Sequence, residues 1–213
     1  MTSRPAAPTY PAFFADAPAI LVHDALAGFL GAAAEGIVEY RYADAVKLAG
    51  HSCPTVAGAF MMARAALRAL YPLPGALPER GEIRVDLRDA RDAGVAGVIA
   101  SVLGLITGAA GDGGFRGIGG RFVRRERLFF EQPLADGEVR FTRLDDGRSV
   151  EAVLRLERVP GDPRMARAMS RSLAGDAQPQ EQALFRELWQ DRVRRILVEH
   201  ADDPELVSIV PRH

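Results

Sequence analysis

The feature of this sequence that constrains its fold most is one long helix, predicted to begin at Pro54. Its apolar residues are spaced alternately four and three positions apart, which is one continuous face of an α-helix: Val56, Phe60, Ala63, Leu67 and Leu70. Pro72, Pro74 and Gly75 then end the helix. A face of this length has to be buried against a second layer, so the chain is expected to form a packed domain.

The patterns around this helix predict an α+β fold. Helical spacing of apolar residues recurs at 15–33 and 95–106, and the C-terminal part around Phe185 and Trp189 is also predicted to be helical. Strand patterns occur at 36–42, 82–88, 121–130, 138–144 and 148–158. This order predicts a mixed, mainly antiparallel sheet flanked by helices, with further helices at the C-terminus.

The chain is expected to divide into three segments. Residues 1–18 contain several prolines and are predicted to be a flexible N-terminal arm. Residues 19–160 hold the helix and strand patterns and are predicted to form the domain. Residues 161–213 are predicted to be a helical extension that packs on the domain or on a partner subunit, because an amphipathic face runs through Phe185, Trp189 and Val193.

Composition and charge exclude several classes of partner. The chain has 213 residues and a formal net charge of −1, and its positive and negative side chains are interleaved, so no nucleic-acid partner is expected. The strongest basic cluster, Arg121, Arg124, Arg125 and Arg127, is interpreted as the solvated face of a strand. The most apolar stretch, 94–110, is too short and glycine-rich to span a membrane. With no signal-peptide pattern at the start, a cytoplasmic location is expected.

The segment Gly50-His51-Ser52-Cys53-Pro54 is the strongest candidate for chemistry. Proline suits the first position of a helix, so Cys53 is predicted to lie at or beside the N-cap of the helix. The helix dipole and the free N–H groups there favour a thiolate. His51 stands two residues earlier, and a thiolate with an imidazole suits a transition metal, with zinc as the first expectation and nickel, copper or iron as alternatives.

A metal site of this kind needs a third ligand. His23 is the candidate, with Asp24 beside it as an orienting or ligating carboxylate. Three protein ligands leave a position open to a small-molecule ligand or substrate, as in a metal-dependent enzyme. The candidate proton carriers are Asp24, Asp112 and Tyr40, and the sequence does not choose among them.

Three other interpretations of the same residues stay open. The protein could be a carrier or sensor of a metal or of haem without turnover, since Cys53-Pro54 is a dipeptide found where a thiolate meets haem iron. It could be a metal-free enzyme with His51 as the base and Cys53 as the nucleophile. Cys53 could also be a buried core residue beside a capping histidine.

A glycine-rich loop is predicted from 108 to 120. Thr107, Gly108, Gly111, Asp112 and Gly113 are the candidates for binding a cofactor or small ligand, because backbone N–H groups in such a loop can face an anion. The alternative is a tight loop that packs against other backbone.

The string Gly50–Pro54, followed by the small residues Val56-Ala57-Gly58-Ala59, resembles the signature of the FmdE-like family, whose founding members are components of formylmethanofuran dehydrogenase. A second match is Leu105-Ile106-Thr107-Gly108-Ala109-Ala110-Gly111, where that family has an apolar helix leading into Thr-Gly-x-x-x-Gly. The resemblance covers about residues 19–159. It implies an α+β fold with a mixed sheet flanked by helices, a metal at the His/Cys site, and a homodimer.

This chain departs from the family pattern at three places. The first histidine of the family motif falls on Ala49, which leaves His23 as the candidate substitute. The family's further cysteine and aspartate before the apolar helix are missing from 93–97. The C-terminal zinc ribbon that many members carry needs more cysteines than the single Cys53.

Overall fold

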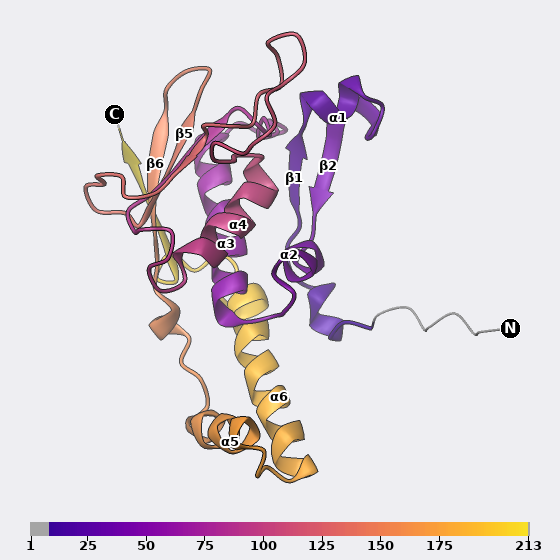
Figure 1. The fold of residues 1–213 in the computed structure, drawn as a ribbon, viewed down its shortest axis with the longest axis vertical. Helices are drawn as coiled ribbons and strands as arrows, with labels where there is room; N and C mark the ends of the chain where they lie inside the picture. The colour runs from indigo at the N-terminus through magenta and orange to yellow at the C-terminus, as the bar shows by residue number, and fades with distance from the viewer. Residues whose placement is uncertain (1–8, 213) are drawn as a thin grey trace, which may run out of the picture.

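The computed structural model describes residues 9–212, and its fold is α+β. Five strands form the main sheet in the order β4-β3-β5-β6-β7 (Figure 1): β3 (Ile83–Leu87), β4 (Leu128–Phe129), β5 (Val139–Arg143), β6 (Ser149–Leu154) and β7 (Val207–Arg212). Only the β3–β4 pair is parallel, so the sheet is mixed and mainly antiparallel as predicted.

Two helices pack on this sheet. Helix α3 (Pro54–Leu70) lies against β6 and β7, and α4 (Ala96–Thr107) lies against β3 and α3. The apolar face predicted for the long helix is confirmed, because all its members are buried: Val56, Phe60, Ala63, Leu67 and Leu70. The buried face of α3 is the centre of the hydrophobic core.

The first predicted helix is wrong, because part of it belongs to a second sheet of two strands. Residues 15–33 hold a strand, β1 (Ile20–His23), and a short helix, α1 (Ala25–Phe29), and β1 pairs antiparallel with β2 (Ile37–Tyr40). Ile20 and Val22 are buried while Leu21 between them is exposed, which is the period of a strand. Helix α2 (Tyr42–Ala49) follows β2 and was not predicted.

The predicted strand at 121–130 is wrong except for the two residues of β4. Phe122 and Glu126 have positive φ angles of 61° and 55°, which interrupt an extended chain. The predicted solvated face is wrong for one member of the basic cluster as well, because Arg124 is buried. The segment is instead an irregular excursion between α4 and β4.

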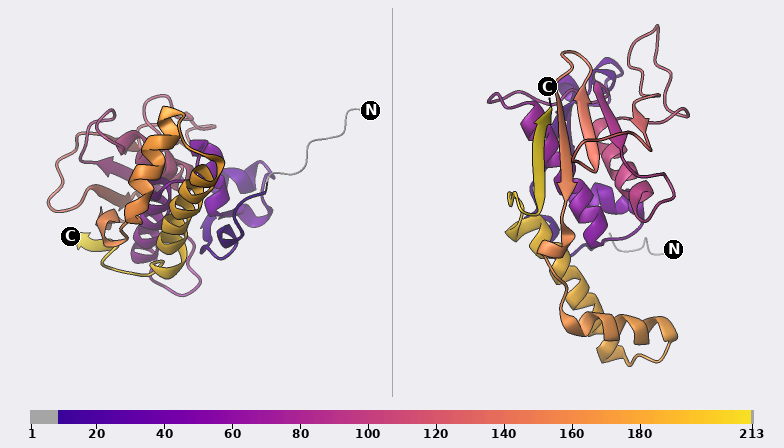
Figure 2. Two further views of the ribbon diagram at one scale, coloured as in Figure 1. Left: turned by 90° about the horizontal axis from the view of Figure 1, so that it is seen from below. Right: turned by 90° about the vertical axis from the view of Figure 1, so that its left-hand side faces the viewer.

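The C-terminal part is a projecting helical hairpin followed by an unpredicted strand. Helices α5 (Pro163–Ala174) and α6 (Pro179–Arg194) pack on each other away from the sheet, and a π-helical turn, Arg195–Glu199, continues α6 (Figure 2). Strand β7 then returns to the sheet and pairs with β6. The predicted extension at 161–213 is therefore helical only as far as Glu199.

The N-terminal segment differs from the loose arm that we expected. Residues 1–8 lie outside the described part of the chain, but Ala12–Phe14 form a 3-10 helix. Phe14 is buried edge-on against Tyr42, with 4.8 Å between the ring centroids. Within residues 9–212, no helix is long and apolar enough to cross a membrane.

Candidate functional site

A cavity of about 750 Å³ lies between α4 and the glycine-rich segment that follows it. The α4 wall consists of small residues, and the opposite side carries the side chains of Leu128 and Phe130. Three arginines reach this cavity from separate parts of the chain: Arg80, Arg91 and Arg124. The cavity therefore combines an apolar body with three arginine residues in its lining.

Two of these arginines are fixed by one buried carboxylate. Asp24 accepts a hydrogen bond from Arg124 over 2.7 Å and one from Arg80 over 2.7 Å. The Asp24 side chain is 6% exposed and that of Arg124 is 9% exposed. Asp24 also caps α1 by accepting the N–H groups of Leu26 and Ala27 at 3.0 and 3.1 Å. The cluster thus ties α1 to one wall of the cavity.

Burial, which by itself raises the pKa of Asp24, is outweighed by its partners. The hydrogen bonds from Arg80 and from the Ala27 N–H, with the positive charges of Arg124 and Arg80, hold this pKa below its ordinary value. Burial raises the pKa of Tyr40. Of the three predicted proton carriers, Asp24 therefore stays charged and Tyr40 stays neutral near neutral pH, and neither is suited to exchange a proton there. Asp112 is exposed at the cavity rim.

Two glycines make room for the Arg124 guanidinium. A Cβ atom at Gly81 would lie 1.3 Å from Nη1 of Arg124, and one at Gly108 would lie 2.9 Å from the same atom. Both glycines have positive φ angles, +92° and +75°, which L side chains rarely adopt. The route of Arg124 to Asp24 therefore depends on glycine at both positions.

Four of the five predicted ligand-binding residues line this cavity: Gly108, Gly111, Asp112 and Gly113. The fifth, Thr107, is fully buried, and its hydroxyl donates to the Leu103 carbonyl over 2.8 Å and accepts the Ala109 N–H at 3.2 Å. Thr107 therefore ends α4 and does not face the cavity. Within the described part of the chain, the N–H groups of Gly111 and Asp112 have no protein acceptor.

Arg91 is the most accessible of the three guanidinium groups. It lies over the ring of Phe130, 5.2 Å from the centroid, and no carboxylate of residues 9–212 pairs with it. None of the three arginines was predicted to be a site residue. The pairs that place Arg80 and Arg124 join positions 56 and 100 residues apart, which no local pattern reveals.

His51 borders a smaller cavity of about 300 Å³ that adjoins the first one. Leu48, Gly97 and Ser101 line both cavities, so the two form one groove along α4. Nδ1 of His51 lies 2.9 Å from the carbonyl oxygen of Ala49. Because a carbonyl only accepts hydrogen bonds, Nδ1 carries the proton, and Nε2 of the neutral ring keeps a free lone pair.

Cys53 is the N-cap residue of α3, as predicted. Its sulfur accepts the Val56 N–H at 3.4 Å, and the side chain is buried. The turn that carries His51 and Cys53 is held from the C-terminal hairpin, because Nε1 of Trp189 donates to the Ser52 carbonyl over 2.9 Å. Gln190 also accepts a hydrogen bond from the Ser52 hydroxyl at 3.0 Å.

His23, the predicted third metal ligand, is held elsewhere. It ends β1 beside α1, and its Nδ1 donates to the Glu79 carboxylate over 2.7 Å. The His51 turn follows α2, at the other end of the β1–β2 ribbon (Figure 1). No group of three His, Cys, Asp or Glu side chains within residues 9–212 is placed to hold a metal ion. The structure therefore does not bring His23 together with His51 and Cys53.

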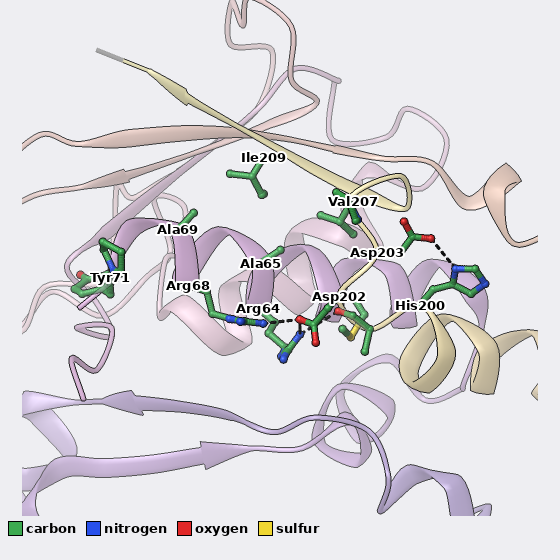
Figure 3. Close-up of a pocket in the computed structure, with 14 residues that line it drawn as sticks. Arg64, Ala65, Arg68, Ala69, Tyr71, His200, Asp202, Asp203, Val207 and Ile209 are labelled. Carbon is green, nitrogen blue, oxygen red and sulfur yellow. Dashed lines mark hydrogen bonds and ion pairs between the residues drawn. The ribbon is translucent and has the colours of Figure 1, made fainter. Parts of the chain in front are cut away.

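A second large cavity, of about 660 Å³, lies between α3 and β7 (Figure 3). Its charged groups already pair with one another: Asp202 accepts from Arg64 and Arg68, and Asp203 accepts from His200. The Asp202 side chain is 67% exposed, so this cluster is largely solvated. The α4 cavity, with its nearly buried arginine and its free backbone N–H groups, is the better candidate for a ligand site.

No protein-family model matches this sequence, and no curated protein matches it either. The resemblance to the FmdE-like family stays a prediction.

Proposed function

We propose that this protein binds a small anionic ligand, a carboxylate or a phosphate, in the α4 cavity. The observation that carries the proposal is that three arginines line a cavity whose lining, among the described residues, holds one carboxylate, Asp112, while Asp24 pairs with Arg80 and Arg124. The positive charge is thus in excess where a ligand would lie. Guanidinium groups and backbone N–H groups are the donors that proteins use for carboxylate and phosphate oxygens.

The two kinds of donor have different roles in this proposal. Arg80 and Arg124 are fixed by Asp24, so they supply a preorganised positive wall that costs little ordering on binding. Arg91 and the N–H groups of Gly111 and Asp112 are free to make the direct hydrogen bonds. The glycines let the anion approach the backbone closely.

A transition metal at His51 and Cys53 is the second candidate. What supports it is the free Nε2 of His51, two residues before a cysteine that caps a helix of 17 residues. Two protein donors leave a metal short of ligands, so the rest would come from the bound small molecule or from a second copy of the chain. The homodimer that the family resemblance implies also stays a prediction.

Calorimetric titration of the full chain with sodium acetate and with inorganic phosphate, at fixed ionic strength, tests the anion site. We expect saturable binding by the wild type and at least about tenfold weaker binding by Arg91→Met, which is about 1.4 kcal/mol. Methionine keeps an apolar contact with Phe130 while it removes the charge. Arg68→Met, in the other cavity, is the matched control and should bind as the wild type does. Equal binding by Arg91→Met would overturn the proposal.

A further inference from the structure

The groove along α4 is long enough to distinguish an elongated anion from a short one. Its floor is one helix face, which holds Gly97 at position i and Ala100, Ser101, Gly104 and Gly108 at i+3, i+4, i+7 and i+11. These residues have short side chains or none, so no side chain of α4 divides the groove. At 1.5 Å per residue, Ser101 and Gly108 are about 10 Å apart along the axis, and Gly97 and Gly108 are roughly 16 Å apart.

The middle of the groove is apolar. Leu48 stands at the junction of the two cavities and is 49% exposed, which is high for a leucine that lines a cavity. Leu128 and Phe130 line the larger cavity opposite α4. An apolar part of a ligand that lies here would cover Leu48 and remove apolar surface from water on both sides.

The two ends of the groove differ in chemistry. The end beside Gly108 and Gly111 carries the guanidinium groups and the free N–H groups, and it attracts an anion. The end beside Gly97 carries His51, whose neutral ring has a free Nε2 that can accept a hydrogen bond from a ligand. One ligand that satisfies both ends has an anion at one terminus and a hydrogen-bond donor at the other.

We infer that the ligand is an elongated anion with an apolar body, long enough to place a hydroxyl or another hydrogen-bond donor against Nε2 of His51. This inference rests on the proposed anion site. In an extended polypeptide, the three backbone bonds of one residue span about 3.5 Å. The nine bonds of an extended ten-carbon chain therefore span roughly 11 Å, which fits the distance from Ser101 to Gly108 along the helix axis. A medium-chain ω-hydroxy carboxylate is the simplest molecule of this class.

A chain-length series provides the test, with acetate, hexanoate, decanoate and 10-hydroxydecanoate as the probes. For the wild type we expect affinity to rise along the series and 10-hydroxydecanoate to bind at least about fivefold tighter than decanoate, as a hydrogen bond worth about 1 kcal/mol would give. His51→Ala should lose only this last advantage. His200→Ala, which changes a histidine of the other cavity, should keep it.

A second variant tests the path of the chain. Ser101 is exposed and lines both cavities, so Ser101→Leu should fill their junction without disturbing the core. We expect this variant to bind acetate as the wild type does and to bind decanoate and 10-hydroxydecanoate at least about tenfold more weakly.

The outcomes separate the two proposals. If acetate and phosphate bind through Arg91, but neither chain length nor His51 nor Ser101→Leu changes affinity, the elongated ligand is wrong and the anion site stands. If no anion of any length binds, or if Arg91→Met changes nothing, the anion site itself is wrong.

Discussion

The guanidinium of Arg124 donates a hydrogen bond over 2.7 Å to the carboxylate of Asp24, a residue one hundred positions earlier in the chain. Both side chains are nearly buried. The contact joins the irregular segment after α4 to the N-terminus of α1, and it fixes a positive charge at the wall of the cavity. The proposed function depends on this contact, because an unpaired buried arginine would be too costly to keep there.

Gly81→Ala should destabilise the protein strongly. The new Cβ would lie 1.3 Å from Nη1 of Arg124, at a φ angle of +92°. We expect a loss of about 3 kcal/mol in the free energy of unfolding, because the Arg124 guanidinium has to leave Asp24 to make room and backbone strain adds to that cost. Gly75→Ala is the control, because it has a φ angle of +79° and no atom within 4 Å, so only the strain of about 1 kcal/mol applies. Equal losses in urea denaturation would show that Arg124 does not occupy this place.

Asp24 and Asp202 each accept hydrogen bonds from two arginines, but Asp24 is nearly buried and Asp202 is largely exposed. Asp24→Asn keeps a helix-capping side chain and leaves two guanidinium groups without their counter-charge, so we expect a loss of about 3 kcal/mol. Asp202→Asn should cost less than about 1 kcal/mol, as exposed ion pairs do. Urea denaturation of both variants measures the contrast, and losses of the same size would contradict the buried cluster.

Glu151 is a second buried carboxylate, and it holds β7 to the sheet. It is 2% exposed, accepts the backbone N–H groups of residues 135–137 and accepts a hydrogen bond from Arg212 at 2.9 Å. Burial raises the pKa of Glu151, but these N–H groups and Arg212 outweigh it and lower the pKa to about 2.

Because the pKa of Glu151 is lower in the folded than in the unfolded protein, the free energy of unfolding depends on pH in the acid range. The stabilising contribution of Glu151 is complete above the unfolded-state pKa of about 4.3 and is lost as pH falls toward 2. We expect it to be on the order of 2–3 kcal/mol. Glu151→Gln should lower stability at neutral pH and flatten the decline between about pH 4.5 and 2. Glu157→Gln, at an exposed position, should leave the decline unchanged. A Glu151→Gln profile parallel to the wild type would refute the assignment.

The predicted metal site has its own test in elemental analysis of the purified chain. Cys53→Ser should stay folded, because serine is a good N-cap residue and would still accept the Val56 N–H. If His51 and Cys53 hold a metal, the wild type carries about one equivalent of zinc, nickel, copper or iron and the variant does not. Metal content that is the same in both proteins would remove Cys53 from the site. A Soret band in the absorption spectrum of the wild type would instead favour haem.

The sequence predicts those parts of the fold in which a regular apolar spacing continues over many residues or in which a helix is ended by neighbouring residues. Helix α3 follows from its apolar spacing and from Pro54 at its first position, and Cys53 as N-cap follows with it. The Thr107-Gly108 end of α4 is equally local, because Gly108 adopts the left-handed conformation that ends helices. Strands β5 and β6 follow from the strand patterns at 138–144 and 148–158, and Gly147 lies in the turn between them.

The failures have a physical pattern as well. A run as short as Ile20-Leu21-Val22 is compatible with a helix or with a strand. The signal that separates β1 from α1 is Asp24, which caps the N-terminus of α1. Strand β7 has the β-branched residues Val207, Ile209 and Val210, but it follows a helical region and pairs with a strand more than fifty residues earlier. The arginines of the candidate site are brought together by tertiary contacts alone.

The most direct test of the anion site measures the chemical shifts of the two backbone N–H groups that should contact the ligand, those of Gly111 and Asp112. In amide proton and nitrogen spectra of the full chain titrated with sodium decanoate, we predict saturable shifts of the Gly111 and Asp112 amides, with one midpoint for both. The same titration of Arg91→Met should need at least about tenfold more decanoate. No shift at Gly111 and Asp112, or shifts confined to the surroundings of Arg64, Arg68 and Asp202 in the other cavity, would contradict the proposed function.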